Sequence, residues 1–261
     1  MPLAGCTAQP DAARVSEHPT IVSLNPCADA ILAEVTAPGQ LLAISHYSHD
    51  PAASSMEAHK AARYGSVSGS LEEVLALDPD VVVADAFLSP ATRAALVRLG
   101  IRLETVAMSG TVEESRRQVL GLARLAGNEA RGRALVARID AALPSAASAR
   151  GDTALVWQAG GIVPGEGALV SDLLRRSGLA SHSAARGLGQ ADYLPLEEVI
   201  ADPPDLILAA GDPRSGENRQ LSHPALAALS ETERARFDPS LLWCGGPTIV
   251  RAAQRLREIT R

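Results

Sequence analysis

Two histidines and an aspartate stand close together in one short segment, His46-Tyr47-Ser48-His49-Asp50. Imidazole and carboxylate groups at this spacing can share a first-row transition metal, and one histidine can be the axial ligand of a cobalt or iron centre. Loop histidines without a further ligand motif are more often only solvated. His46 and His49 are therefore candidate metal ligands, with a solvated loop as the alternative.

The chain has three cysteines, Cys6, Cys27 and Cys244, which are too few for a disulfide scaffold and lack the spacing of a zinc ribbon. Cys27 and Cys244 each stand at the end of an expected strand. They could form a disulfide in an oxidising compartment. Because such a bridge needs Cα atoms within about 7 Å of each other, the expectation is two free, partly buried thiols.

Cys6 ends the segment Leu3-Ala4-Gly5-Cys6, which matches the lipobox at which bacterial lipoprotein signal peptides are cleaved. A complete signal has roughly 7–15 apolar residues before the cut, whereas only five residues precede Cys6. The residues that follow are small and polar and contain proline, as in a flexible tether. We expect residues 1–19 to be a signal remnant and tether, with a lipid on Cys6.

The sequence shows neither a P-loop nor a G-x-S-x-G nucleophile motif. The Gly-rich segment 160–167 follows an expected strand, but its spacing is not G-x-G-x-x-G and Pro164 interrupts the turn. It is either a loop whose backbone approaches a ligand, at Gly161, or a tight connection. We assign no catalytic residue and expect no enzyme.

The composition is that of a globular protein. The 261 residues are 46% hydrophobic and 21% charged, which excludes wholesale disorder. The length suits two lobes of about 100–120 residues each or one large α/β domain. The net charge of −6 argues against nucleic acid as a partner, because binding to phosphates needs a basic face. No apolar run approaches the roughly 18–20 residues that a membrane-spanning helix needs.

Short β-branched runs alternate with helical patterns, which indicates an α/β fold with right-handed crossovers. Several runs are continuously apolar, as is typical of strands buried on both faces of a parallel sheet. The expected strands are 20–24, 41–45, 81–85, 102–106, 153–158, 205–210 and 240–244, and the expected helices include 71–77, 90–99, 169–177 and 196–201.

Residues 112–143 contain no strand pattern, and their apolar residues recur at helical spacing. One helix of roughly 30 residues would be about 45 Å long, which is too long for a crossover inside one lobe. We expect a single stiff helix that joins two lobes. Gly127 and Asn128 leave a break into two helices as the alternative.

Two segments repeat the same pattern. Residues 70–83 read SLEEVLALDPDVVV, and residues 195–208 read PLEEVIADPPDLIL. Each contains a short amphipathic helix, a stop with proline and a buried strand. The chain is therefore expected to consist of two related lobes.

The chain has only seven aromatic residues, and five of them lie in or beside the carboxyl ends of expected strands or in a nearby loop. They are Tyr47, Phe87, Trp157, Tyr193 and Trp243. Because open parallel sheets bind ligands beyond those ends, aromatics on two facing lobes would line a cleft for a bulky planar ligand. The alternative is that each ring covers its own lobe.

The opening IVSLNP segment, the two LEE segments, the central helical region, the Gly-rich loop and a closing helix occur in an order found in one family. The chain resembles the periplasmic binding proteins of ABC importers for cobalamin and ferric siderophores, from about residue 20 to 261. The resemblance implies an N-terminal lobe at 20–110, a linker helix at 111–148, a C-terminal lobe at 149–261 and a ligand cleft between the lobes. It also implies a periplasmic location.

In that family one glutamate on each lobe docks onto the membrane permease, and the matching residues are Glu72 and Glu197. The alternative is that both are solvated acids that interact favourably with the helix dipole. The expected partners are the permease with its ATPase and a metal complex, and the chain is expected to be a monomer without a cofactor. The expected ligand-binding residues are Asn25, Pro26, Cys27, His46, Tyr47, Phe87, Trp157, Gly161, Tyr193 and Trp243.

The expected cleft offers aromatics and histidine but few arginines, which favours a corrinoid such as cobalamin over an anionic siderophore. Heme is a further candidate, with Tyr47 or His46 as the iron ligand. The alternatives to a receptor for a metal complex are a receptor for a free metal ion and an enzyme, such as a chelatase, on the same scaffold.

Overall fold

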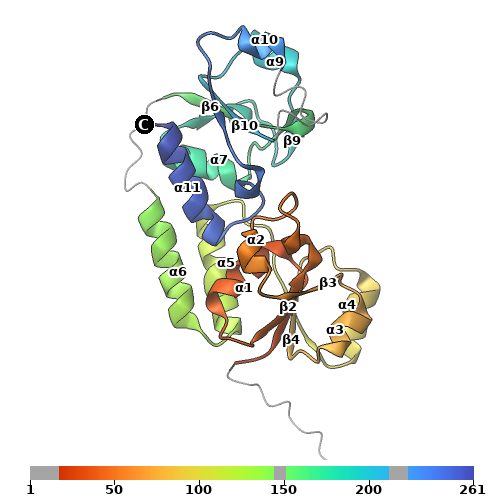
Figure 1. The fold of residues 1–261 in the computed structure, drawn as a ribbon. Coiled ribbons are helices and arrows are strands. Elements are labelled where there is room, and N and C mark those ends of the chain that lie inside the picture. The colour runs from red at the N-terminus through yellow and green to blue at the C-terminus, as the bar shows by residue number, and fades with distance from the viewer. Residues whose placement is uncertain (1–17, 144–150, 212–222) are drawn as a thin grey trace, which may run out of the picture.

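The computed structural model describes residues 18–143, 151–211 and 223–261. They form two α/β lobes that are stacked one above the other and joined along one side by helices (Figure 1). Both main sheets are parallel, as the alternation of strand and helix patterns predicted. None of the described helices is long and apolar enough to cross a membrane.

The N-terminal lobe is built on a five-stranded parallel sheet with the order β3-β2-β1-β4-β5. Central strand β1 (Ile21–Ser23) is buried on both faces: Ile21 belongs to one apolar cluster and Val22 to another. The other strands are β2 (Leu41–Ser45), β3 (Gly65–Val67), β4 (Val81–Ala84) and β5 (Arg102–Thr105). The helices are α1 (Pro26–Val35), η1 (His46–His49), α2 (Ala58–Ala61), α3 (Leu71–Ala76) and α4 (Pro90–Arg98).

The C-terminal lobe contains a four-stranded parallel sheet with the order β11-β10-β6-β8 and a small antiparallel ribbon, β7-β9. Its strands are β6 (Thr153–Gln158), β7 (Ile162–Val163), β8 (Ala180–Ser181), β9 (Asp192–Tyr193), β10 (Leu206–Ala210) and β11 (Glu233–Arg236). Its helices are η2 (Ala159–Gly161), α7 (Leu169–Arg176), α8 (His182–Ala185), α9 (Leu196–Ala201), α10 (Pro224–Ala227), η4 (Pro239–Leu241) and α11 (Pro247–Ile259).

The strand expected at 240–244 is wrong. Asp238 caps a helical turn there by accepting a hydrogen bond from the Ser240 N–H, and Pro239 occupies the first helical position, which suits its fixed φ. The last strand is β11, at the sheet edge. Its Glu-Arg-Ala-Arg sequence is mostly exposed, so no buried apolar run marked it in the sequence.

The single linker helix expected at 111–148 is also wrong. The connector is a hairpin of two helices, α5 (Val112–Leu125) and α6 (Glu129–Ala142), that lie side by side in Figure 1. Gly127 takes a positive φ of 68° at the turn, which favours glycine. A Cβ on Gly132 would lie 2.4 Å from the Ala123 Cβ, so this glycine allows the two helices to pack closely.

The two lobes share a continuous apolar core. Ile31 of α1, Val119 of α5, Leu173 of α7 and Ile249 of α11 belong to the same buried cluster. Helix α11 packs against α6, α7 and α1. The lobes are therefore held together by buried contacts as well as by the connector.

The sequence repeat has a matching repeat of hydrogen bonds. The Asp80 carboxylate accepts from the backbone N–H and the hydroxyl of Thr20, at 2.7 and 2.9 Å. Asp205 accepts in the same way from Thr153, at 2.7 and 2.8 Å. In each lobe this pair of residues lies at the amino ends of two neighbouring parallel strands, β1 and β4 or β6 and β10. The two lobes therefore share this contact.

Candidate functional site

The site begins at the carboxyl end of β1, between neighbours β2 and β4, where ligands bind in open parallel sheets. Asn25 caps α1 there: its Oδ1 accepts from the backbone N–H groups of Cys27 and Ala28 at 2.9 and 2.8 Å. Its Nδ2 donates to Asp85 at 3.3 Å. Asn25 thus links the ends of two adjacent strands and fixes the start of α1.

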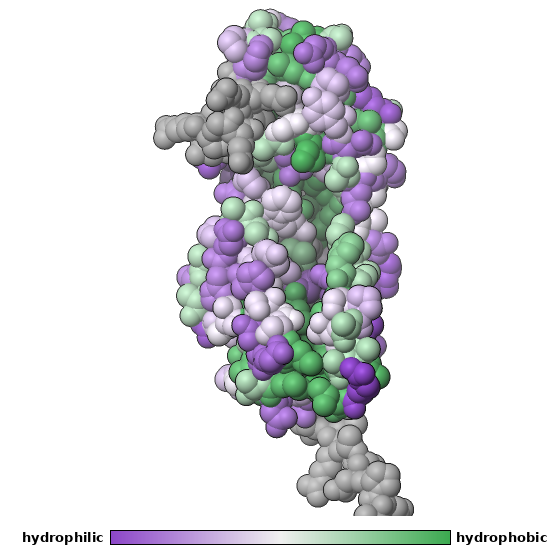
Figure 2. Space-filling view, turned by 90° about the vertical axis from the view of Figure 1, so that its right-hand side faces the viewer, coloured by the Kyte–Doolittle hydropathy of each residue, from purple (hydrophilic) through white to green (hydrophobic). Residues whose placement is uncertain are grey.

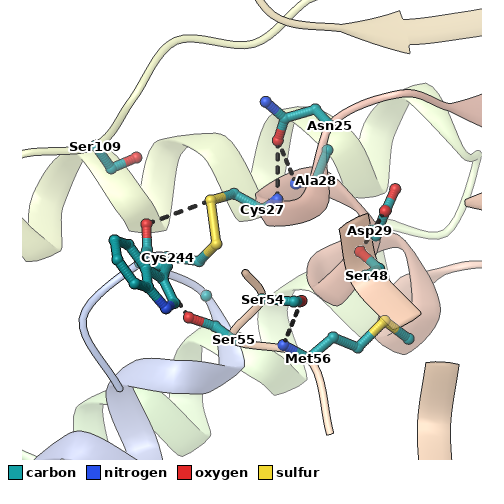
Figure 3. Close-up of a disulfide and its surroundings, with 12 residues drawn as sticks. Asn25, Cys27, Ala28, Asp29, Ser48, Ser54, Ser55, Met56, Ser109 and Cys244 are labelled. Atoms are coloured by element: carbon teal, nitrogen blue, oxygen red, sulfur yellow. Dashed lines mark hydrogen bonds between the residues drawn. A yellow bond between two sulfur atoms is a disulfide. The ribbon is translucent and has the colours of Figure 1, made fainter. Parts of the chain in front are cut away.

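Cys27 and Cys244 form a disulfide between the two lobes, with their Cα atoms 5.1 Å apart (Figure 3). The expectation of free thiols is therefore wrong. Residues 217 positions apart in sequence meet because the segment before α11 reaches the carboxyl edge of the N-terminal sheet. Cys27 contributes to the site as half of this covalent link.

The segment that carries Cys244 is further fastened by hydrogen bonds from its backbone. The N–H of Cys244 donates to Ser55 Oγ at 3.1 Å, and the N–H of Gly246 donates to Ser115 Oγ at 2.7 Å. Trp243, next to the disulfide, keeps 47% of its surface exposed. Its carbonyl oxygen lies 3.4 Å from Cys27 Sγ, so this tryptophan of the C-terminal lobe lies at the expected site of the N-terminal lobe.

His46 and Tyr47 lie at the end of β2, with their ring centroids 4.1 Å apart. Tyr47 is 53% exposed, and Nδ1 of His46 lies 3.3 Å from the Val67 carbonyl oxygen. His49 is exposed. Among the described residues no three His, Cys, Asp or Glu side chains are grouped as a metal site.

A buried carboxyl group supports this turn from below. Asp29 of α1 is fully buried, and its Oδ2 accepts from the Ser45 N–H at 2.9 Å and from the Ser48 hydroxyl at 2.6 Å (Figure 3). Burial raises the pKa of Asp29 to about 7, although hydrogen bonds from Ser23, Ser48 and Ser45 oppose the shift. Sequence analysis missed Asp29, since a single acid in an apolar helix shows no pattern.

Two further aromatic residues that were expected to bind the ligand are exposed, one on each lobe. Phe87 follows β4, is 87% exposed, and its N–H donates to Asp85, the partner of Asn25. Tyr193 on β9 is 54% exposed and pairs with Ile162 on β7. Figure 2 shows the side of the molecule where the lobes face each other, and its surface is hollowed between the two lobes.

Trp157 does not belong to this site. Its side chain is completely buried in the C-terminal lobe among Leu155, Leu194 and Ile207. The prediction failed because both faces of β6 are covered. Val156 and Trp157 point to opposite faces of the sheet, and each is buried in an apolar cluster. Gly161 is buried too, and its carbonyl oxygen accepts from the Leu194 N–H at 3.0 Å, which makes it part of a tight connection.

Glu72 and Glu197 are exposed at equivalent positions on α3 and α9, one on each lobe. Glu73, the residue after Glu72, has a different role. Glu73 accepts from the N–H and the hydroxyl of Ser68, both at 2.6 Å, so it stabilises the start of α3. Glu72 is therefore the acid of its pair that is available to a partner.

Two exposed apolar side chains were not among the ligand-binding residues expected from the sequence. Met108 lies on the segment between β5 and α5 and is 67% exposed, and Ile162 is 46% exposed. Ser109, next to Met108, lies beside the disulfide in Figure 3. Cys6, the expected lipid site, lies outside the described residues.

The sequence matches the model of a family described as periplasmic binding protein over residues 21–230. The chain therefore belongs to this family, as its motifs indicated, and its location is periplasmic. Among curated proteins, none matches the sequence.

Solved structures of such proteins share the fold over almost the whole chain. The periplasmic heme-binding protein HutB of Vibrio cholerae has a TM-score of 0.74 at 17% identity, covering 94% of this chain and 99% of its own. The vitamin B12-binding protein BtuF of the same organism has a TM-score of 0.70 at 20% identity, with 91% and 94% covered. The heme-binding protein RhuT of Roseiflexus sp. RS-1 has a TM-score of 0.69 at 20% identity, with 93% and 97% covered.

Proposed function

We propose that this chain is the substrate-binding protein of an ABC importer and that it captures a bulky metal complex between its lobes. The substrate class is a corrinoid such as cobalamin or a ferric siderophore, bound as cargo and released to a permease without chemical turnover. The observation that carries the proposal is the placement of Tyr47, Phe87, Tyr193 and Trp243. These four of only seven aromatic residues are exposed at strand ends or cleft loops of both lobes.

Heme is a second candidate, favoured by a specific observation. The rings of His46 and Tyr47 are adjacent, and the tyrosine is half exposed. Both side chains are of types that ligate heme iron. Two of the structurally similar proteins bind heme by their own descriptions.

The first experiment is a fluorescence titration that isolates Trp243. Trp157→Phe leaves Trp243 as the only tryptophan, because the chain has two. We expect saturable quenching by cyanocobalamin, hemin or a ferric hydroxamate complex, corrected with free N-acetyltryptophanamide for absorption by the coloured ligands. A response to Zn²⁺ alone would favour an ion receptor, and no response to any of them would contradict the proposal.

Trp243 is expected to contribute directly to binding. Trp243→Ala should weaken the complex by roughly 1–3 kcal/mol, because alanine lacks the ring surface on which the ligand would stack. Isothermal titration calorimetry measures this change, with Trp157→Phe as the matched control. An unchanged dissociation constant would remove Trp243 from the binding surface.

We further propose that Glu72 and Glu197 dock onto basic residues of the permease. Paired carboxylates on two lobes suit bidentate recognition by arginine. The double variant Glu72→Ala, Glu197→Ala should keep its ligand affinity and lose uptake in a transport assay. Glu129→Ala, an exposed acid at the start of α6, should transport normally. Loss of ligand binding in the double variant would contradict the docking role.

Anchoring by a lipid on Cys6 completes the proposal. The lipobox pattern supports it, and a periplasmic receptor tethered near the permease would deliver its cargo efficiently. Cys6→Ser, expressed with a full export signal, should move the protein from the membrane fraction to the soluble periplasm. Equal partitioning of both proteins would contradict anchoring.

A further inference from the structure

A pocket with a volume of about 170 Å³ lies where α1, α2, α6 and α11 meet. It is separate from the aromatic site, because none of Tyr47, Phe87, Tyr193 and Trp243 lines it. Its walls come from both lobes and from the connector. Any molecule bound there would contact all three parts of the chain.

The acidic side chains of this pocket are already neutralised. Glu34 accepts from Lys60 and from Arg138, each at 2.8 Å, and Glu57 lies 2.9 Å from the same lysine. Burial alone would raise the pKa of Glu34, but the hydrogen bonds from Lys60 and Arg138 lower it. Both carboxylates therefore stay ionised and paired, and they leave no negative charge for a cationic ligand.

The third positively charged side chain of the pocket is that of Arg251. Its Nη2 donates to the carbonyl oxygen of Ser55, and no Asp or Glu oxygen among the described residues lies within the 4.0 Å of an ion pair. The five charged groups that line the pocket are Glu34, Glu57, Lys60, Arg138 and Arg251. Three are positive and two negative, so the pocket has an excess charge of about +1.

Thr248 adds an unused hydroxyl on the same helix. It is 1% exposed and lines the pocket, and its Oγ1 has no hydrogen-bond partner among the described residues. A buried hydroxyl without a partner is costly. Thr248 and Arg251 are three residues apart on α11, a spacing that puts both on one helix face. The Thr248 hydroxyl has no acceptor among the described residues, and the Arg251 guanidinium has further N–H donors besides the one that binds Ser55.

We propose that this pocket binds a small monocarboxylate with a short apolar body. One carboxylate would accept from the Arg251 guanidinium and the Thr248 hydroxyl, and it would balance the excess charge. The apolar body would contact the remaining lining residues Ala30, Met56, Pro247 and Val250. This site is additional to the aromatic site and does not depend on which metal complex binds there.

The test uses benzoate as the probe and neutral benzamide as its matched control, measured by isothermal titration calorimetry on the full chain. We expect saturable binding of benzoate, with a dissociation constant of about 1 mM or below, which ligands of this size reach. Benzamide should not saturate. Arg251→Gln should weaken benzoate binding about tenfold or more, since a charge-assisted hydrogen bond is lost.

Two variants separate ligand binding from folding. Thr248→Val removes only the unpaired hydroxyl, so it should weaken benzoate binding severalfold while the melting temperature stays level or rises. Arg255→Gln changes an arginine of the same helix that does not line the pocket, so this variant should bind benzoate normally. The proposal is overturned if the wild type shows no saturable binding, if Arg251→Gln binds like the wild type, or if Trp243→Ala abolishes binding instead. Binding of cyanocobalamin or hemin, measured separately, reports on the aromatic site alone.

Discussion

At the scale of the residue, Asp29 shows how burial can make a single side chain sensitive to pH. The carboxyl group is fully enclosed, and one of its oxygens has no partner among the described residues. Protonation removes the cost of a buried charge. The group therefore changes charge near neutral pH directly beneath the turn that carries His46 and Tyr47.

This arrangement predicts a particular pH dependence of stability. The pKa of Asp29 is raised from 3.8 to about 7 in the folded protein, so the folded state holds a proton that the unfolded state has released. The stabilisation is complete below pH 4 and is lost as the pH rises towards 7, by up to about 4 kcal/mol.

Asp29→Asn isolates this contribution, because its amide is neutral at every pH and its oxygen can accept the same hydrogen bonds. Chemical denaturation at several pH values should show a fall in the free energy of unfolding between pH 4 and pH 7 for the wild type that is much smaller for Asp29→Asn. Parallel curves for the two proteins would contradict the prediction.

At the scale of the element, the α5–α6 hairpin depends on one close contact. Gly132 faces Ala123, and there is no room for a Cβ between them. Gly121 is the matched case, a glycine inside α5 whose added Cβ would meet nothing within 4 Å. The two positions make opposite predictions for the same substitution.

Gly132→Ala should lower the free energy of unfolding by about 1–3 kcal/mol, because the helices must move apart. Gly121→Ala should raise it by roughly 0.5–1 kcal/mol, because alanine loses less entropy in a helix. Urea denaturation measures both changes. Similar effects of the two substitutions would show that the hairpin is not tightly packed at Gly132.

At the scale of the whole molecule, the Cys27–Cys244 disulfide links the lobes beside the candidate site. It acts together with the continuous apolar core and with the hydrogen bonds of the segment from Cys244 to Gly246. The molecule therefore holds its lobes at a fixed spacing around the aromatic residues. Such a scaffold favours a preorganised site over one formed by large lobe movements.

The double variant Cys27→Ser, Cys244→Ser should lose about 2–5 kcal/mol of stability, because the bridge closes a long loop in the unfolded chain. It should still fold, since the shared core remains. Thermal unfolding of the variant, compared with the oxidised and the reduced wild type, measures the loss. Equal melting temperatures for the variant and the oxidised wild type would contradict a structural role.

Local sequence patterns predicted the α/β class and most strands of the two main sheets. Runs such as Val81–Ala84 are continuously apolar, as is typical of a strand that is buried on both faces of a parallel sheet. The repeated LEE segments indicated two related lobes, and the order of motifs indicated the family. Asn25, His46, Tyr47 and Phe87 could be placed beyond strand ends because the apolar runs before them end at these points. Trp243 was placed at the end of a strand that the structure does not contain.

Only the tertiary structure decided how these elements meet. A helical pattern of apolar residues fits one long helix and a hairpin of two helices equally well. The chain reverses its direction within only a few residues around Gly127. Trp157 is buried because apolar clusters cover both faces of β6. The pairing of Cys27 with Cys244 and the burial of Asp29 depend on contacts between distant segments. Local patterns carry no information about such contacts, because the three-dimensional packing alone brings those segments together.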